Sequence, residues 1–283
     1  AVESANSNSY SGRIDLMKVK IKETKYYLAQ KQGTNPGWLL LHGFMGSHAD
    51  FSKVMSDLPA TVTAPDLLGH GQTISACSDP DFSIEQQADQ LALLICQYLK
   101  PPLIVWGYSM GGRVALALSL RHPQLVKYLI LESSTAGIAN DKQRKARQQH
   151  DIQLAGQLRD QGLTTFVDRW EQLPLFATQQ KLPSFQRNFI RQQRLNQKTQ
   201  GLARSLAAMG TGQMPNYWPA LAKLQIPVLL LAGEQDLKFQ RITAKMATRL
   251  PHSQRFVVPA AGHNIHLENW TSLFQIFKQE RLI

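Results

Sequence analysis

The residues best placed to do chemistry in this chain begin with a serine between two glycines. Ser109 lies in the segment 107–111, which reads Gly-Tyr-Ser-Met-Gly, a G-x-S-x-G pattern. The apolar residues 103–106 before it predict a short strand, and the Ala- and Leu-rich residues 112–118 after it predict a helix. A strand, a tight glycine-flanked turn and a helix form a nucleophile elbow, which lifts the serine hydroxyl out of the sheet to a helix N-terminus.

A serine hydroxyl is a weak nucleophile or base until a histidine takes its proton, and a carboxylate must orient that histidine. Asp236 follows a predicted strand in the segment Gly-Glu-Gln-Asp, and His263 follows another in Ala-Gly-His. All three residues come just after the carboxyl ends of predicted strands, in the order serine, acid, histidine, so we expect them to meet at one edge of a sheet. Glu234 competes with Asp236 for the role of the acid, and we favour Asp236 because it lies deeper in the loop.

Backbone N–H groups near the serine should stabilise negative charge that develops on a substrate oxygen. We expect one from Met110, the residue after the nucleophile, and one from Phe44, in the loop after the first buried strand. His42 and His70, in glycine-flanked loops, are expected to make supporting hydrogen bonds, and His266 is expected to be structural. The sequence has no P-loop, no dinucleotide-binding glycine pattern and no metal-ligand spacing, so we predict no cofactor and no metal.

Strands alternate with helices around these residues. Strands are predicted at 18–30 (a pair), 38–41, 61–66, 103–106, 128–132, 227–233 and 255–258, and helices at 51–58, 84–99, 112–118 and 270–281. This alternation indicates an α/β fold with a mostly parallel central sheet and helices on both faces. Residues 139–215 interrupt it, because they are rich in Gln and Arg, helical in character and without a convincing strand. We interpret them as an inserted helical cap on a core formed by residues 17–138 and 216–283.

Composition narrows the function further. The net charge is +11, and residues 139–215 hold twelve Lys and Arg against five Asp and Glu, so +7 of that charge lies in the cap. The basic residues are scattered among glutamines, which argues against a nucleic-acid partner and favours an anionic small molecule. No apolar run is long enough to span a bilayer.

The two cysteines, Cys77 and Cys96, lack metal-ligand or C-x-x-C spacing, so we expect them to be reduced and structural in a cytoplasmic protein. Residues 1–16 are Ser- and Asn-rich without an apolar segment, and we interpret them as a vector-derived leader, with Met17 as the native start. The sequence does not indicate an oligomeric state.

From about residue 17 onward the chain resembles the α/β hydrolases. The resembling segments are 42–44, 66–71, 107–113, 130–132, 233–239 and 261–269. Within that superfamily it looks most like the 2-succinyl-6-hydroxy-2,4-cyclohexadiene-1-carboxylate synthases of menaquinone and phylloquinone biosynthesis. Arg113 after the elbow, Lys238 and Phe239 after the acid, and the extended motif after His263 carry this closer resemblance. Met110 departs from the usual leucine, and Ser-Ser-Thr-Ala at 133–136 replaces the usual Gly-Gly-x-Pro, a change that bears on the cap hinge or the fit of the substrate.

The resemblance implies a substrate with several carboxylates, held by arginines and aromatic side chains. Matched position by position, the implied substrate-binding residues are Tyr108, Arg113, Arg147, Trp170, Phe176 and Arg191. The implied activity is a lyase, in which His263, oriented by Asp236, activates Ser109 to abstract a proton so that pyruvate is eliminated. The same serine, acid and histidine would equally serve a carboxylesterase or C–C bond hydrolase acting through an acyl-enzyme, and a catalytically silent ligand receptor is the remaining alternative.

Overall fold

A central sheet organises the molecule, whose computed structural model describes residues 12–76 and 82–283. The described strands are β1 (Ile14–Ile21), β2 (Thr24–Lys31), β3 (Thr34–Leu41), β4 (Ala60–Pro65), β5 (Ile74–Ser75), β6 (Leu103–Tyr108), β7 (Val126–Glu132), β8 (Val228–Gly233) and β9 (Ser253–Val258). Their order is β1-β2-β4-β3-β6-β7-β8-β9, with β5 paired to β2. Every pairing from β4 to β9 is parallel, whereas β1, β2 and β5 pair antiparallel. The predicted mostly parallel α/β sheet is therefore confirmed.

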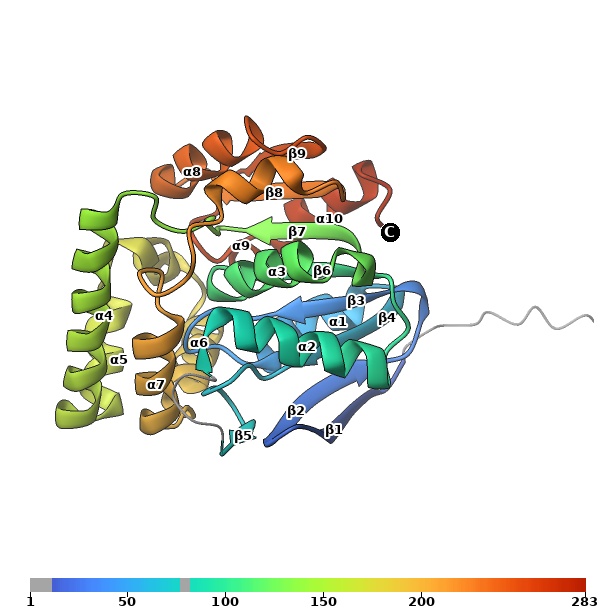
Figure 1. Ribbon diagram of the computed structural model, residues 1–283. Helices are drawn as coiled ribbons and strands as arrows, with labels where there is room; N and C mark the ends of the chain where they lie inside the picture. The colour runs from blue at the N-terminus through green and yellow to red at the C-terminus, as the bar shows by residue number, and fades with distance from the viewer. Residues whose placement is uncertain (1–11, 77–81) are drawn as a thin grey trace, which may run out of the picture.

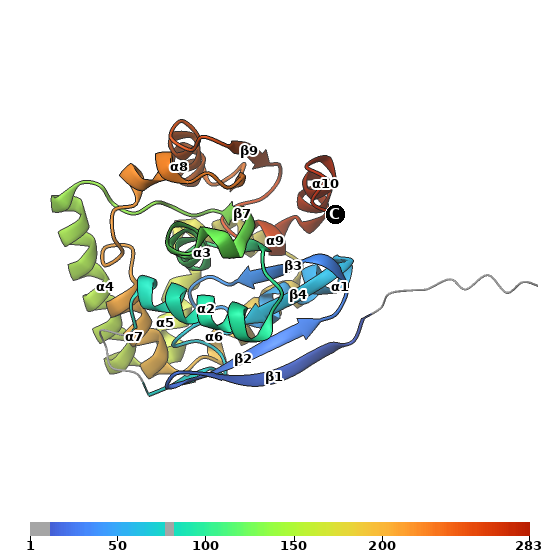
Figure 2. The same cartoon turned by 45° about the vertical axis from the view of Figure 1, so that its right-hand side comes forward.

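Helices cover both faces of this sheet. They are α1 (Ser52–Asp57), α2 (Ile84–Tyr98), α3 (Met110–Arg121), α8 (Leu237–Ala247), α9 (Ile265–Glu268) and α10 (Trp270–Gln279), with 3₁₀ turns at His48–Phe51, Pro123–Leu125, Pro174–Lys181 and Trp218–Lys223. Apolar side chains of α2, α3 and α8 pack on one face, and those of α1, α9 and α10 pack on the other. Helices α2 and α3 lie in front of the strands in Figures 1 and 2.

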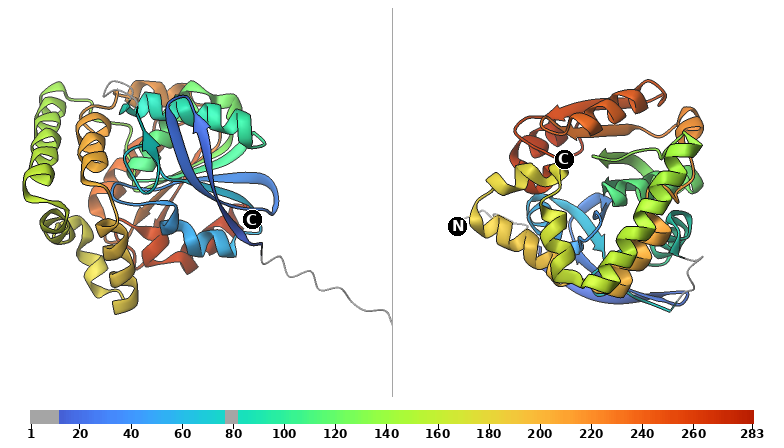
Figure 3. Two further views of the ribbon diagram at one scale, coloured as in Figure 1. Left: turned by 90° about the horizontal axis from the view of Figure 1, so that it is seen from below. Right: turned by 90° about the vertical axis from the view of Figure 1, so that its left-hand side faces the viewer.

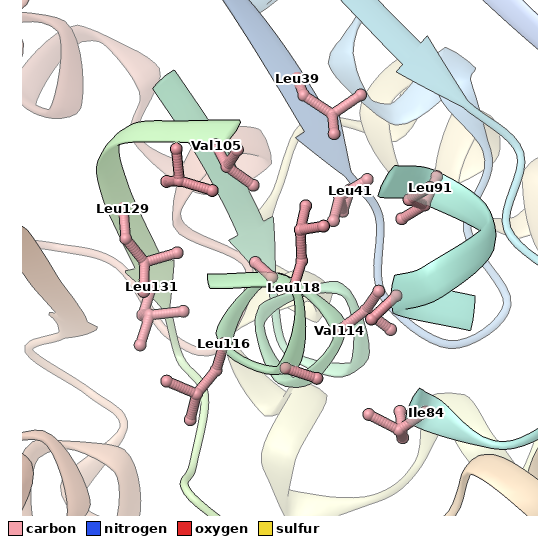
Figure 4. Close-up of a cluster of buried hydrophobic side chains, with 14 of the residues drawn as sticks. Leu39, Leu41, Ile84, Leu91, Val105, Val114, Leu116, Leu118, Leu129 and Leu131 are labelled. Atoms are coloured by element: carbon pink, nitrogen blue, oxygen red, sulfur yellow. The ribbon is translucent and has the colours of Figure 1, made fainter. Parts of the chain in front are cut away.

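The two faces follow from the period-two alternation of side chains along a strand. In β3, Leu39 and Leu41 belong to the cluster under α2 and α3, whereas Trp38 and Leu40 belong to the opposite cluster. Figure 4 shows Leu39 and Leu41 in one cluster with side chains of α2 and α3, with Leu41 nearer to α3 than Leu39. Because a parallel strand is covered on both faces, its sequence reads as a continuous apolar run.

Between β7 and β8, residues 133–227 are described throughout and contain no strand. Their four α-helices are α4 (Asp141–Gln161), α5 (Leu163–Glu171), α6 (Ser184–Leu195) and α7 (Thr199–Met209). These helices gather at the end of the sheet toward which the arrows of β3 and β7 point, and Figure 3 (right) looks onto them from that end. They share an apolar cluster that includes Leu158, Phe166 and Leu202 and also Met45 of the core. Gln197 joins the cap to the core, accepting from Gly71 N–H (2.9 Å) and donating to the Gly46 carbonyl (3.1 Å).

The N-terminal boundary was predicted incorrectly. β1 begins at Ile14, so residues 14–16, which the sequence placed in a leader, pair with residues 29–31 of β2. β1 is an edge strand, and its first apolar residues, Ile14 and Leu16, are exposed. The alternation of apolar and polar residues is therefore too short there to stand out from the polar residues that precede it. The remainder of the expected leader, residues 1–11, lies outside the described residues.

Cys96 is free, as expected, but it is exposed near the end of α2 and does not pack into the core as a structural residue would. Cys77 lies outside the described residues. Among the described helices, none combines the length and the apolar character that a bilayer span requires. The cytoplasmic location stays a prediction.

Candidate active site

The elbow is a sharp connection between β6 and α3. β6 ends at Tyr108, α3 begins at Met110, and Ser109 between them adopts φ 51° and ψ −107°, a backbone conformation that side-chain-bearing residues rarely adopt. The two flanking glycines make this turn possible. A Cβ on Gly107 would collide with the backbone of Gly111, and a Cβ on Gly111 would collide with the carbonyl oxygen of Leu41.

Ser109, His263 and Asp236 form one hydrogen-bonded chain. The distance between Ser109 Oγ and His263 Nε2 is 3.0 Å, and that between His263 Nδ1 and Asp236 Oδ2 is 2.8 Å. Asp236 is itself held because its Oδ1 accepts from the backbone N–H of Phe239 (3.2 Å) at the start of α8. With the carboxylate on Nδ1, the proton belongs on that nitrogen, and Nε2 is left to accept from the serine hydroxyl. The arrangement can therefore withdraw a proton from Ser109.

The competing acid, Glu234, does not reach His263. It is exposed, and its Oε2 accepts from Ala260 N–H at 2.9 Å. Asp236 is the carboxylate that contacts the histidine.

Two carboxylates that the sequence reasoning missed hold the loop of His263. Glu268 accepts from the backbone N–H groups on either side of that histidine, Gly262 (2.6 Å) and Asn264 (3.2 Å), and burial raises its pKa. Glu132 is fully buried, and its side chain accepts from the backbone N–H of His266 (3.1 Å), from its Nδ1 (2.9 Å) and from an indole N–H. The available sequence signal for Glu132 was a carboxylate directly after the apolar run Leu129–Leu131.

Glu132 also touches the elbow, because its backbone carbonyl accepts from Ser109 N–H at 2.9 Å. One residue at the end of β7 thus links the loop of the serine to the loop of the histidine. His266 is buried in this link, which agrees with the structural role expected for it.

The two residues predicted to supply N–H donors are found in the wall of one cavity. Phe44 and Met110 both line the cavity that contains Ser109, and Met110 is the first residue of α3, whose N–H has no acceptor within the helix. His42 supports the loop of Phe44, because its Nε2 accepts from Leu67 N–H (2.9 Å) and its Nδ1 donates to the Gly43 carbonyl (2.8 Å). Burial lowers the pKa of His42 to about 4, so the ring is neutral at pH 7.

The second supporting histidine, His70, makes a hydrogen bond from Nδ1 to the Leu68 carbonyl at 3.0 Å. Its ring lies edge-on to Phe44, 5.6 Å between centroids. The supporting roles expected for His42 and His70 are therefore confirmed.

Ser109 and His263 open into a cavity of about 580 Å³ between the core and the cap, large enough for a compact organic ligand. Five of the six residues that the resemblance implied for substrate binding line it: Tyr108, Arg113, Arg147, Trp170 and Phe176. The rings of Tyr108 and Phe176 lie 5.4 Å and 6.1 Å from the His263 ring, and Trp170 lies 5.8 Å from Phe176. Aromatic side chains thus form the wall next to the histidine.

Two of the implied substrate-binding arginines face the same cavity from different elements. Arg113 of α3 is buried and donates to the Met209 carbonyl of α7, and burial together with the charge of Arg147 lowers its pKa to about 10. Arg147 of α4 donates from Nε to Asp151 at 2.8 Å. In the described part of the chain no acceptor engages its terminal nitrogens. A guanidinium whose Nε is already hydrogen-bonded and whose two terminal nitrogens are unpaired can donate two hydrogen bonds to a carboxylate.

Comparisons with known proteins place this chain in a family. A sequence model of the alpha/beta hydrolase fold matches residues 39–269. The chain is 36% identical, over 88% of its length and 92% of the relative's, to a Bacillus subtilis (strain 168) protein whose name assigns it provisionally as a 2-succinyl-6-hydroxy-2,4-cyclohexadiene-1-carboxylate synthase. It is 32% identical to the synthase of that name from Escherichia coli O1:K1 / APEC, over 85% of this chain and 93% of the relative. The solved structure of MenH from S. aureus matches with a TM-score of 0.83 and 35% identity, covering 92% of this chain and 99% of that one.

The chain belongs to the 2-succinyl-6-hydroxy-2,4-cyclohexadiene-1-carboxylate synthase family of α/β hydrolases. The fold alone would not separate this family from its neighbours. A thermophilic esterase from Thermogutta terrifontis, solved with malate bound, superposes with a TM-score of 0.79 at 25% identity. Sequence identity distinguishes the synthase family, whereas the overall fold does not.

The sixth implied residue, Arg191, does not line the cavity with Ser109. It lies on α6, and its guanidinium donates to Glu171 (2.7 Å) and Asp168 (2.7 Å) of α5, beside a separate small pocket. These carboxylates raise its pKa. The family spacing placed an arginine on α6, but the packing of α6 against α5 directs that arginine to two acids. The substrate-binding role predicted for Arg191 is therefore not supported by the structure.

The segment that departs from the synthase pattern, residues 133–136, lies in the cavity wall. Ser133, Ser134 and Thr135 line the cavity. Ser133, at the position where the resemblance led us to expect glycine, has φ 48°, in the left-handed region that glycine adopts freely. The Ser134 hydroxyl donates to the Ser109 carbonyl at 3.0 Å, which ties the segment to the elbow.

Proposed function

We propose that this chain is a lyase that converts 2-succinyl-5-enolpyruvyl-6-hydroxy-3-cyclohexene-1-carboxylate to 2-succinyl-6-hydroxy-2,4-cyclohexadiene-1-carboxylate and pyruvate. One observation carries the proposal. The hydrogen-bonded chain of Ser109, His263 and Asp236 opens into a cavity that also presents the guanidinium groups of Arg113 and Arg147. Membership of the synthase family supports the same reaction.

In this reaction Ser109 acts as a base. His263, oriented by Asp236, takes the hydroxyl proton of Ser109, and the serine oxygen abstracts a proton from the cyclohexene ring. The electrons of that C–H bond, at ring carbon 2, form a double bond to carbon 3. The existing ring double bond shifts from carbons 3 and 4 to carbons 4 and 5, and the C–O bond to the enolpyruvyl group at carbon 5 breaks. The departing enolpyruvate takes up a proton and becomes pyruvate, so atoms and electrons balance without a cofactor.

The remaining residues hold the substrate and stabilise charge. The N–H groups of Phe44 and Met110 are the proposed donors to a substrate carbonyl oxygen that gains negative charge as the ring proton leaves. Arg113 and Arg147 bind substrate carboxylates, and the net positive charge of the cap attracts the anion. The aromatic wall of Tyr108, Trp170 and Phe176 limits where the ring can lie.

The test is pyruvate release by purified protein supplied with the preceding intermediate, compared with the spontaneous background. Ser109→Ala should lower the rate by about 10²–10⁴-fold, the usual contribution of a positioned base. Ser119→Ala, a serine of the same helix outside the cavity, is the matched control and should leave the rate unchanged. Wild-type protein that releases pyruvate no faster than background would refute the proposal. Rapid turnover of short acyl esters, with an acyl group trapped on Ser109, would instead establish a hydrolase.

A further inference from the structure

One face of α8 forms part of the cavity wall but has no role in the proposed mechanism. Lys238, Arg241 and Lys245 all line the cavity that contains Ser109. Their spacing of three and four residues places them on one side of the helix. α8 starts directly after Asp236, so this face is joined to the hydrogen-bonded chain, and the ring of Phe239 lies 4.7 Å from that of His263.

We propose that this face of α8 is a second carboxylate subsite, in which Lys238, Arg241 and Lys245 bind an anionic group that Arg113 and Arg147 do not reach. The subsite would take a carboxylate arm of the ligand. The inference rests on the proposed function only in taking that ligand to be a polycarboxylate.

The two ammonium groups lie over aromatic rings of the cavity wall. Lys238 Nζ is 5.4 Å from the centroid of Phe239, and Lys245 Nζ is 4.9 Å from the centroid of Trp218. Both rings line the cavity as well. A cation over a ring face is attracted by the ring's quadrupole, so these contacts favour side-chain positions at the wall.

The charge of the cavity is unbalanced. Five cationic residues line it, but among the described residues Asp151 is the single carboxylate, and it is already paired with Arg147. None of the described ion pairs includes Lys238, Arg241 or Lys245. The pKa of Lys238 is lowered, first by partial loss of solvent at the cavity wall and then by the charge of Arg147. An anion bound between the two walls would be attracted by the positive charge of both.

A ligand that satisfies both sets must carry at least two anionic groups. A monocarboxylate can be held by Arg113 and Arg147 alone, whereas a polycarboxylate gains further contacts on α8. The α8 face would therefore make the protein bind polycarboxylates more tightly than monocarboxylates. This preference would not depend on the reaction at Ser109.

Isothermal titration calorimetry with tricarballylate and with cyclohexanecarboxylate tests the subsite without any turnover. Lys238→Gln and Lys245→Gln should each weaken tricarballylate binding about ten-fold and leave cyclohexanecarboxylate binding within about two-fold. Lys278→Gln is the matched control, since that ammonium also lies over a ring (4.9 Å from the centroid of Phe274) but outside the cavity lining. All three lysines keep solvent-exposed surface, so folding should persist in each variant, and thermal melts check it.

Unchanged tricarballylate affinity in both α8 variants would overturn the subsite, as would wild-type protein that binds the two probes equally well. The pyruvate assay reports separately on the proposed function. Selective loss of tricarballylate binding together with no pyruvate release would leave the subsite standing and reject the reaction.

Discussion

Arg147 and Arg191 are a matched pair for one question. The family pattern implies that both bind substrate, but the structure places only one of them at the cavity. Their side chains are almost equally exposed, at 38% and 36%, and each donates to an aspartate at 2.7–2.8 Å. Only Arg147 lines the cavity with Ser109. A charge-assisted hydrogen bond is worth about 1.5–3 kcal/mol, which corresponds to about 10- to 150-fold in kcat/KM. We therefore expect Arg147→Gln to lower kcat/KM by that factor, mainly through KM, and Arg191→Gln to stay within about two-fold.

The same pair should differ in stability for a separate reason. Asp151, the partner of Arg147, is 1% exposed, and losing its cation leaves a buried carboxylate at a cost of about 1–3 kcal/mol. Arg191 pairs with Asp168, whose side chain is 56% exposed, and with Glu171, which keeps Arg194, so its loss should cost less than about 1 kcal/mol. The double variant Arg147→Gln/Asp151→Asn should regain stability without regaining affinity.

Steady-state pyruvate kinetics and urea unfolding measure the two effects on the same preparations. An equal rise in KM for Arg191→Gln and Arg147→Gln would refute the reasoning, because it would mean that Arg191 reaches the substrate from its place against α5. A double variant that recovers both stability and KM would refute it too, because the kinetic effect would then be a consequence of local unfolding.

Two further predictions follow from buried hydrogen bonds. The pKa of His42 in the folded protein is about 4, below its unfolded value of 6.5. Its contribution to the free energy of unfolding is therefore complete above pH 6.5 and is lost as the pH falls toward 4. The total loss is about 3 kcal/mol. Urea unfolding at pH 7.0 and 4.5 should show a smaller difference for His42→Asn than for wild type, and an unchanged difference would contradict this account. Glu132→Gln should slow the labelling of Ser109 by a serine-reactive phosphonate, because one amide cannot accept from all the donors that the carboxylate serves. Labelling of a folded variant at the wild-type rate would show that the link between the two loops does not position the serine.

The local features of this chain were readable from sequence because each has a short-range physical cause. The glycines at 107 and 111 predict a tight turn, and the elbow has its strained residue at Ser109. Continuous apolar runs predict strands covered on both faces, and the parallel strands are found at those runs. The strand pair at 18–30 was predicted, but the first residues of the edge strand β1 were missed because Ile14 and Leu16 are exposed and leave only a weak alternating signal.

The sequence by itself determined the α/β fold class, the elbow and the order of Ser109, Asp236 and His263. These features depend on residues that are close together in the sequence or on their order along the chain. They can therefore be recognised without a structure. Only the tertiary structure decided which charged side chains face the cavity. It turned Arg191 toward α5, brought Lys238 and Lys245 to the wall beside Arg147, and set Glu132 between the two loops. Spacing along the chain can place a residue on a helix or strand, but what its side chain contacts depends on packing against elements far away in sequence.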